Sequence, residues 1–326
     1  MEDTKVKNRV IGVDISLDDT SFAIVDVRGN IIARDEFNTM DYEDVSQYVG
    51  VLSEKLIMLA EENGGFENIR SMGISAPSGN FLTGCIENSP NLCWKGVVPM
   101  AAMLRDRLGI AVALGNDAHL AGLGEHVFGC AHGMNNFVLI TLGHGIGSCI
   151  FSNGQAHLGT DGFAGEIGHT CLVYNGRTCG CGKKGCLEAY CGANGIVLTA
   201  QEMMAESDAP SLMRNFEKLS PKEITKCCEQ GDEMAIEVYR RTGEMLGMSM
   251  AGYASVLDPE AIVFAGGVSK AGHWLLDPAN KVFEQLVFHN TRGHVKFLTS
   301  ALEDHERDVL GASALAWGIK EYSLFK

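Results

Sequence analysis

Four potential metal ligands lie within 18 residues of one another in the second half of the chain. His169 is followed by Cys179, Cys181 and Cys186, and the glycines between the cysteines allow the chain to turn tightly. Three thiolates and one imidazole make a closed tetrahedral set for Zn2+, which is typical of a structural site rather than a hydrolytic one. The alternative is a set of free or redox-active thiols. We predict a zinc knuckle formed by these four side chains.

Two carboxylates flank the predicted knuckle. Glu166 lies three residues before His169, and Glu188 lies two residues after Cys186. Taken singly, each would most often be a solvated surface residue. A loop fixed by a metal ion would hold both carboxylates rigidly, and rigid carboxylates suit the paired hydroxyl groups of a sugar. Glu166 and Glu188 are therefore candidate substrate ligands.

Asp117 is the candidate general base. Asn116 and Asp117 follow a short apolar run at 110–114, a predicted strand, and precede a predicted helix that runs to about Phe128. Ligands of open α/β sheets bind at the carboxyl ends of strands. A carboxylate at that place can accept a proton from an attacking hydroxyl group. The simpler interpretation is that Asp117 only caps the helix.

Two glycine-rich turns could contact a nucleotide. Gly143, Gly145 and Gly147 occupy alternate positions between two predicted strands, where backbone N–H groups can surround phosphate oxygens. Gly266 and Gly267 follow another predicted strand and suit close approach to the adenosine part of a nucleotide. Neither turn has the pattern of a P-loop, which excludes that class of enzyme.

The elements that must position these residues form a pattern that occurs twice: a sheet that begins with hairpins and continues through crossover helices. This arrangement predicts two α/β lobes with a cleft between them. The first half has predicted strands at 9–15, 21–27, 31–37 and 69–75 and a predicted helix at 45–59. The second half has predicted strands at 110–114, 137–142, 146–151 and 261–264 and helical patterns at 221–257 and 308–322.

Composition excludes several classes of protein. The chain has 326 residues, 46% of them hydrophobic, which is enough for two cores and argues against disorder. The net charge is −15, so neither nucleic acid nor an anionic membrane is an expected partner. The N-terminal residues show no apolar signal segment, and we expect a cytoplasmic protein with reduced thiols.

Taken together in this order, the motifs resemble those of the ROK family of repressors and sugar kinases. The resemblance extends over about residues 9–320, and its most specific part is the knuckle with the preceding Glu-x-Gly-His. The segments that carry it are Asp14 on the first hairpin, Asn88-Ser89-Pro90-Asn91-Leu92, Asn116-Asp117, Leu142 to Gly147, Gly165 to His169, Cys179, Cys181, Cys186 and Glu188, and Ala265 to Ser269.

The resemblance implies a fold and an activity. The fold would be the actin-like ATPase (ribonuclease-H-like) fold, with a smaller lobe at 1–117 joined by the C-terminal helix 308–326 and a larger lobe at 118–307. The activity would be ATP- and Mg2+-dependent transfer of a phosphoryl group to the 6-hydroxyl of a hexose, in a glucokinase-like homodimer with a structural Zn2+. Glucose and N-acetylhexosamines fit the same set of polar groups.

The resemblance also implies a role for each matching residue. Asp117 would be the base for the sugar hydroxyl, and His169 would use one ring nitrogen for zinc and the other for the sugar. The sugar ligands would be Asn91, Asn116, Glu166, His169 and Glu188. The nucleotide ligands would be Asp14, Ser16, Gly143, His144, Gly145, Gly147, Gly266 and Gly267.

The first phosphate loop departs from the family pattern Asp-x-Gly-Gly-Thr. Asp14 is followed by Ile15-Ser16-Leu17-Asp18, which adds a side chain and a negative charge where phosphate should approach. Two unit charges about 4 Å apart repel by roughly 4 kcal/mol at an effective dielectric near 20. We therefore hypothesise that His144, which replaces a Thr or small residue in the second loop, pairs with Asp18 or donates to a phosphate oxygen.

The altered loop also motivates an alternative function, a sugar-binding sensor or regulator that has lost catalysis. A DNA-binding repressor is not expected, because only about eight residues precede the first predicted strand, too few for a helix-turn-helix module.

Overall fold

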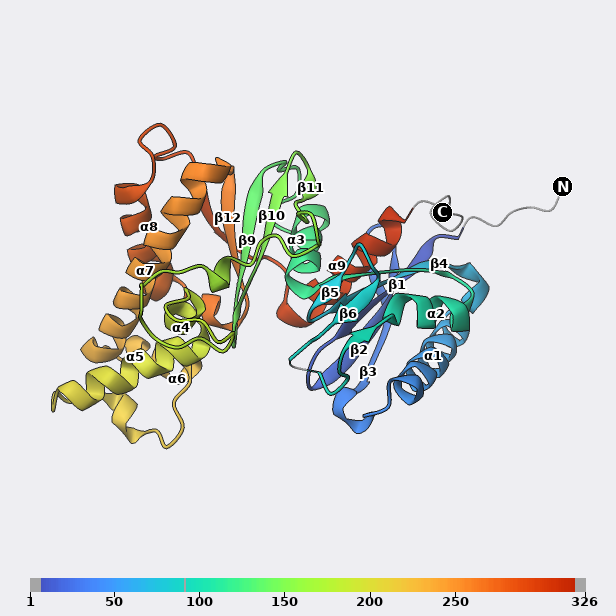
Figure 1. Cartoon of the computed structure of the whole chain (residues 1–326), viewed down its shortest axis with the longest axis horizontal. Helices are drawn as coiled ribbons and strands as arrows, with labels where there is room; N and C mark the ends of the chain where they lie inside the picture. Colours follow the sequence, from blue (N-terminus) through green and yellow to red (C-terminus); the bar gives the residue numbers. More distant parts are fainter. Residues whose placement is uncertain (1–6, 91, 320–326) are drawn as a thin grey trace. The chain divides into compact units, whose positions relative to one another are not determined.

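The computed structural model describes residues 7–90 and 92–319, which form two compact units (Figure 1). Unit 1 is drawn from Met1–Gly133, Leu158–Ala164 and Ala301–Lys326, and unit 2 from Met134–His157 and Gly165–Ser300. The lobe boundary predicted at Asp117 coincides with the start of a helix, α3 (Asp117–Val127), and unit 1 includes that helix because it packs against the C-terminal helix α9 (Asp304–Gly318).

The sheet of unit 1 has the strand order β3-β2-β1-β4-β8. Its first three strands form antiparallel hairpins, and β4 and β8 continue the sheet in parallel with β1. The strands are β1 (Arg9–Ile15), β2 (Asp19–Asp26), β3 (Ile31–Asn38), β4 (Ile69–Ala76) and β8 (Ala111–Asn116). The predicted strands at 9–15, 21–27, 31–37 and 69–75 are therefore confirmed.

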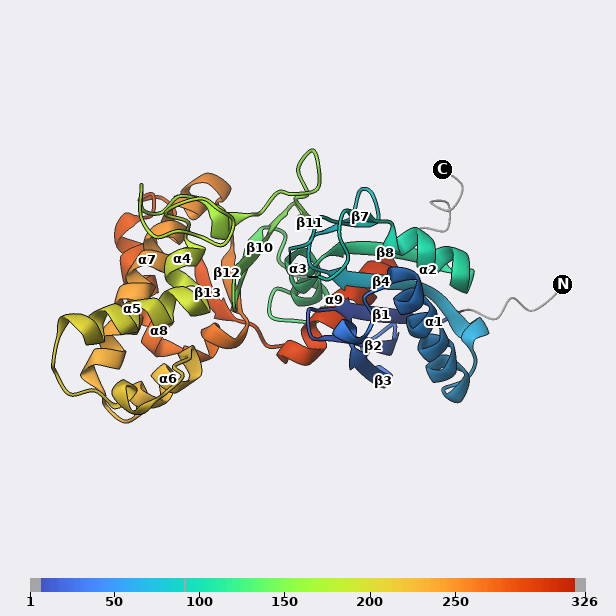
Figure 2. The same ribbon diagram turned by 60° about the horizontal axis from the view of Figure 1, so that its bottom comes forward.

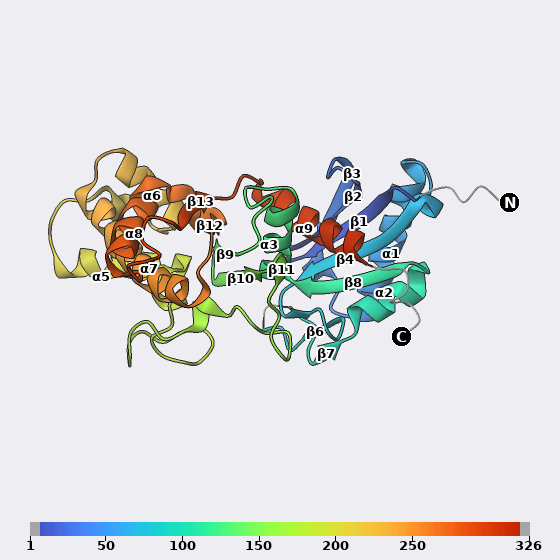
Figure 3. The same cartoon turned by 90° about the horizontal axis from the view of Figure 1, so that it is seen from above.

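Helices cover both faces of this sheet. On one face, α1 (Val45–Glu62) and α2 (Met100–Leu108) pack over a core that includes Tyr48, Leu52 and Trp94. On the other face lies α9, which crosses β1 and β4 (Figure 3). The backbone of α9 approaches unusually closely, because a Cβ atom at Gly12 or Gly73 would lie only 2.2 or 1.9 Å from a carbonyl oxygen of α9.

The sheet of unit 2 repeats the same arrangement, with the order β11-β10-β9-β12-β13. Again three strands pair antiparallel, and two more follow in parallel with the first of them. The strands are β9 (Phe137–Leu142), β10 (Ile146–Ser152), β11 (Gln155–Ala156), β12 (Ala261–Ala265) and β13 (Lys296–Thr299). The predicted architectural repeat is confirmed, since β9 and β10 correspond to β1 and β2.

The helices of unit 2 gather around α7 (Glu233–Leu257), the longest helix in the described part of the chain. It packs along α8 (His273–Leu286), and α4 (Glu188–Cys191), α5 (Ala193–Glu206) and α6 (Pro221–Glu229) also pack against α7 (Figure 2). The core between these helices and the sheet includes Ile140, Phe264 and Tyr239.

Several short elements complete the described residues. A small three-stranded sheet consists of β5 (Gly79–Asn80), β6 (Cys85–Glu87) and β7 (Val97–Val98). The 3-10 helices are η1 (Thr39–Asp41), η2 (Phe66–Asn68), η3 (Ile167–His169), η4 (Leu212–Asn215) and η5 (Gly267–Ala271). Across residues 7–90 and 92–319, no helix has both the length and the apolar content needed to cross a membrane.

Candidate active site

The four predicted metal ligands come together in unit 2. His169 Nδ1 lies 3.7 Å from Cys179 Sγ, and Cys181 Sγ lies 3.7 Å from Cys186 Sγ. All four ligand atoms are within 4.8 Å of one another. Ligands about 2.3 Å from one tetrahedral ion would be about 3.8 Å apart, so the donor set and its spacing fit an ion such as Zn2+. His169 uses Nδ1 here, which leaves Nε2 for another partner.

Tight backbone turns hold the cluster in place. The Cys179 N–H donates to the carbonyl of Lys183, and the Lys183 ammonium donates to the carbonyl of His169. Arg177, which was not predicted from the sequence, connects the loop to the neighbouring helices. Its guanidinium donates to the carbonyls of Ala189 and Gly195 and stacks over the ring of Tyr190 at 4.8 Å. The loop is thereby attached to α4 and α5.

Glu188 lies between the metal cluster and the glycine turn. Its Oε1 is 3.4 Å from Cys179 Sγ, and its Oε2 accepts the Ile146 N–H at 2.9 Å. Glu166 by contrast is exposed, and it precedes η3, whose Ile167 N–H donates to Ser148 Oγ on β10. Strand β10 therefore contacts the segments that carry Glu166 and Glu188.

The two predicted nucleotide turns line one pocket of about 710 Å³ in unit 2. Gly143 and His144 come from the β9–β10 turn, and Gly267 comes from the turn after β12. Gly266 has φ +86° and brings the end of β12 against the carbonyl of Leu142, where a Cβ atom would lie at 2.6 Å. A pocket of this size suits a nucleotide-sized ligand.

Three lysines that the sequence reasoning missed also line this pocket: Lys222, Lys226 and Lys270. Lys222 and Lys226 are four residues apart on α6, so they share one helix face with Thr225 and Glu229, which line the pocket too. The i, i+4 spacing was the available signal, but it is equally typical of a solvent-exposed face. The pocket combines glycine backbone with positive charge, which suits phosphate groups.

Asn116 and Asp117 stand at the C-terminal end of β8 in unit 1, as predicted. Asn116 Oδ1 caps α3 by accepting the Ala118 N–H at 3.0 Å, and Asp117 Oδ1 accepts the same N–H at 2.7 Å. Asp117 is exposed. The capping interpretation thus applies to Asn116, while one Asp117 oxygen also helps to satisfy the first turn.

Asp14 belongs to an acidic cluster that also includes Asp308 and Asp117. Burial, and next the charge of Asp308, raise the pKa of Asp14 well above its usual range, and Asp117 adds to this effect. Burial also raises the pKa of Asp308, although the Arg307 guanidinium opposes the shift through hydrogen bonds of 2.9 and 3.1 Å. This cluster exists because α9 packs so closely on β1.

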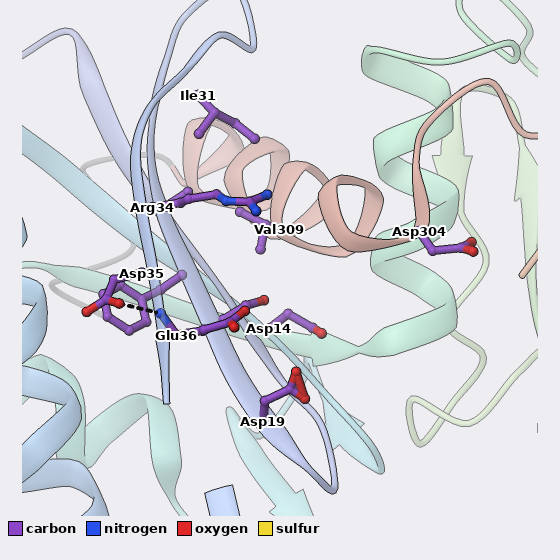
Figure 4. A pocket seen from close by; sticks show the side chains of 11 residues that line it. Asp14, Asp19, Ile31, Arg34, Asp35, Glu36, Asp304 and Val309 are labelled. Carbon is purple, nitrogen blue, oxygen red and sulfur yellow. Dashed lines mark hydrogen bonds between the residues drawn. The ribbon is translucent and has the colours of Figure 1, made fainter. Parts of the chain in front are cut away.

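A second pocket of about 360 Å³ lies beside Asp14 in unit 1 (Figure 4). Asp14 on β1, Ser21 on β2 and Glu36 on β3 are in register across the hairpins. The carboxylates lining the pocket are those of Asp14, Asp19, Asp35, Glu36 and Asp304, with Arg34 as a cationic neighbour. This lining repels phosphate rather than attracting it.

The altered first loop forms the β1–β2 turn. The Ser16 N–H and hydroxyl both donate to the Asp19 carbonyl, at 2.9 and 2.8 Å, and Leu17 is 43% exposed. Ser16 thus closes its own turn. Asn91 lies outside the described residues. The assembly of Asp117 with Glu166, His169 and Glu188 in one cleft, and the pairing of His144 with Asp18, stay predictions.

Comparison with known proteins gives relatives over nearly the whole chain. A glucokinase from Halalkalibacterium halodurans is 31% identical over 319 residues, which cover 95% of this chain and 94% of the relative. A crystal structure of a ROK family glucokinase from Streptomyces griseus in complex with glucose and AMPPNP matches with a TM-score of 0.78 at 29% identity, over 95% of this chain and 99% of that chain. A xylose repressor from Caldicellulosiruptor bescii is 24% identical, over 94% of this chain and 77% of the repressor.

The duplicated sheets and these structural relatives define the class: the chain has the actin-like ATPase fold of the ROK kinases, as predicted. The model of the ROK family matches residues 10–319, and the chain therefore belongs to the ROK family. Relatives with activity as sugar kinases support hexose phosphorylation, while the repressors show that members of the family also include regulators.

Proposed function

We propose that this protein transfers the γ-phosphoryl group of ATP to the 6-hydroxyl of a hexose, either glucose or an N-acetylhexosamine. The observation that carries the proposal is the pocket of unit 2, where both predicted nucleotide turns and three lysines surround a volume of about 710 Å³. Glucokinases at about 30% identity over nearly the full chain support ATP as donor and a hexose as acceptor.

Asp117 is the proposed general base. Its carboxylate is exposed at the end of β8, where it can accept the proton of the sugar hydroxyl. As that proton leaves, the hydroxyl oxygen bonds to the γ-phosphorus, the bond to the bridging oxygen breaks, and ADP departs. Such a transfer depends mainly on positioning and on neutralised charge. In unit 2, the glycine turn would position the phosphates of the donor and the three lysines would neutralise their charge.

Two ions fit the residues present. Asp14, which lies beside Asp308 and Asp117, would offer a hard oxygen ligand of the kind Mg2+ prefers once its carboxyl group is ionised, and the ion would neutralise charge on the phosphates. The His169, Cys179, Cys181 and Cys186 set fits a structural Zn2+. Zinc would fix Glu188 and the Nε2 edge of His169 as sugar ligands, with Glu166, Asn116 and Asn91 completing the proposed set.

The test is sugar-dependent ADP release from Mg-ATP with a panel of hexoses and N-acetylhexosamines. We expect turnover with at least one sugar and a loss of about 10²–10⁴-fold in kcat for Asp117→Asn, because a positioned base contributes that much. The matched control is Asp106→Asn, an exposed carboxylate on α2 that should leave kcat unchanged. Equal activity of Asp117→Asn and wild type would remove Asp117 from the mechanism.

The second candidate function is a sugar-binding regulator without turnover. It is favoured by the β1–β2 turn, where Ser16 and Leu17 replace the expected glycines and Asp18 the expected threonine, and by the repressor relatives. Sugar binding by calorimetry, combined with no ADP release for any sugar of the panel, would support this function and contradict the kinase.

A further inference from the structure

The Glu188 carboxylate contacts both the metal cluster and the residue that follows the glycine turn. The resemblance assigns it to the sugar, but in the structure its Oε2 accepts the backbone N–H of Ile146, the first residue of β10 after the glycine turn. Its Oε1 faces Cys179 Sγ of the metal cluster at 3.4 Å. One carboxylate thus bridges the cluster and the turn.

The Ile146 N–H has a particular need for this partner. Ile146 is 4% exposed, and β11, the strand on the outer side of β10, pairs only with Phe151 and Ser152. Glu188 therefore takes the place of the missing neighbouring strand at the start of β10. A buried N–H group without a partner would be strongly unfavourable.

Packing fixes the same contact. A Cβ atom at Gly145 would lie 2.5 Å from Glu188 Oε2, so the turn and the carboxylate share one tight fit. Helix α4 begins at Glu188, and α5 follows it directly. The first residue of α5 makes a further bond to the turn, since the Ala193 N–H donates to the Gly143 carbonyl at 2.9 Å. Both attachments follow directly in the chain from Cys186 of the knuckle.

We infer that Glu188 is a positioning residue through which the metal knuckle sets the shape of the Gly143–Gly147 phosphate turn. This inference rests on the proposed function for the role of that turn. It predicts that occupancy of the cluster controls affinity for the phosphoryl donor, although none of the four ligand side chains lines the nucleotide pocket.

The first experiment measures AMPPNP binding by calorimetry without sugar. Glu188→Ala should weaken binding about tenfold, because the turn loses one buried hydrogen bond. Glu188→Gln should bind almost as wild type does, since its amide oxygen can still accept the Ile146 N–H. Metal content by elemental analysis should be the same in all three proteins.

Glu166→Ala is the matched control. It removes the same charge from the other side of the cluster, and Glu166 makes no hydrogen bond to residues 143–147 within the described part of the chain. It should weaken sugar binding while leaving AMPPNP affinity unchanged. If Glu188→Ala behaves like Glu166→Ala, then Glu188 is a sugar ligand only and the inference is wrong.

A second readout does not depend on nucleotide. Hydrogen exchange at Ile146 and the adjoining turn should become faster in Glu188→Ala and in wild type after removal of metal by a chelator, but not in Glu188→Gln. Unchanged exchange in Glu188→Ala would overturn the inference whatever the nucleotide does. A wild-type protein that shows the exchange effect but binds no nucleotide would instead overturn the proposed function.

Discussion

The two units have the same sheet but opposite chemistry at the corresponding turn. In both, two antiparallel strands meet at a tight hairpin, β1–β2 in unit 1 and β9–β10 in unit 2. The pocket beside the first hairpin is lined by five carboxylates and one guanidinium, and the pocket beside the second by three lysines and one carboxylate. One fold element, used twice, has acquired two electrostatic roles.

The backbones of the turns differ in the same sense. The β1–β2 turn is closed by a side chain of its own as well as by backbone, because both the Ser16 hydroxyl and the Ser16 N–H donate to the Asp19 carbonyl, and it carries the exposed Asp18 carboxylate. Within the β9–β10 turn the closing bond comes from the backbone, with the Gly143 N–H donating to the Gly145 carbonyl at 3.0 Å, and the side chain that holds this turn, Glu188, lies outside it. The comparison supports the proposal that the phosphoryl donor binds in unit 2 and that unit 1 supplies the carboxylates.

Among changes to the two turns, the largest expected effect comes from Gly145→Ala. The new methyl group would lie 2.5 Å from Glu188 Oε2, so the turn or the carboxylate must move. We expect a loss of AMPPNP affinity of about tenfold or more and faster hydrogen exchange at residues 143–147. Because the backbone φ of Gly145 is not in the left-handed region, the faster exchange of the unliganded turn would report on the contact with Glu188 and not on backbone strain.

Gly143→Ala is the control within the same turn. A Cβ atom there would meet no other atom within 4 Å, so hydrogen exchange of the unliganded turn should match wild type. The readout is limited to the unliganded protein, since Gly143 lines the nucleotide pocket. Similar exchange in the two variants would mean that the fit against Glu188 does not shape the turn.

The hairpins that differ so much in charge were the easiest part of the fold to predict. Short apolar runs next to turn residues mark β1 and β9, and three cysteines within eight residues mark the metal loop. By contrast, α8 contains Pro278 and was not predicted, because proline normally indicates the end of a helix. The sequence therefore predicted the elements whose residue pattern is regular within a few positions, and missed a helix with an irregular pattern.

The parts of the site that the sequence did not reveal depend on contacts between distant residues. Asp308 raises the pKa of Asp14 across 294 positions of chain, and only the packing of α9 on Gly12 and Gly73 brings them together. Lys222 and Lys226 look like an ordinary charged helix face until α6 is placed beside the glycine turn. Such neighbours follow from tertiary structure and not from spacing.

Asp18→Asn should have an intermediate effect. If the β1–β2 turn approaches the phosphates, as the family pattern implies, removing its exposed carboxylate should raise AMPPNP affinity about two- to threefold at low salt. The gain should disappear at about 0.5 M salt, because exposed charges are then screened. Calorimetry at the two salt concentrations measures both.

The control for Asp18 is Glu62→Gln at the end of α1. This exposed charge is separated from the turn by most of an 18-residue helix, about 27 Å long, so nucleotide affinity should not change. An equal gain in both variants would point to net charge alone. No gain in Asp18→Asn would show that this turn is not a phosphate loop.

Asp14→Asn should give the smallest effect, on stability and with a defined pH dependence. Burial and Asp308 raise the pKa of Asp14 in the folded protein, whereas the unfolded chain should titrate near 3.9. As pH rises above that value, the unfolded state loses its proton first, so wild-type stability falls until the folded-state pKa is passed. Asn carries no charge and escapes this penalty. The variant should therefore melt like wild type near pH 4 and roughly 2–4 °C higher at neutral pH, measured by thermal unfolding across that range.

The control is Glu36→Gln, which changes an exposed carboxylate of the same pocket and should show no such gain. A gain that is constant with pH would show that the acidic cluster around Asp14 is not under electrostatic strain.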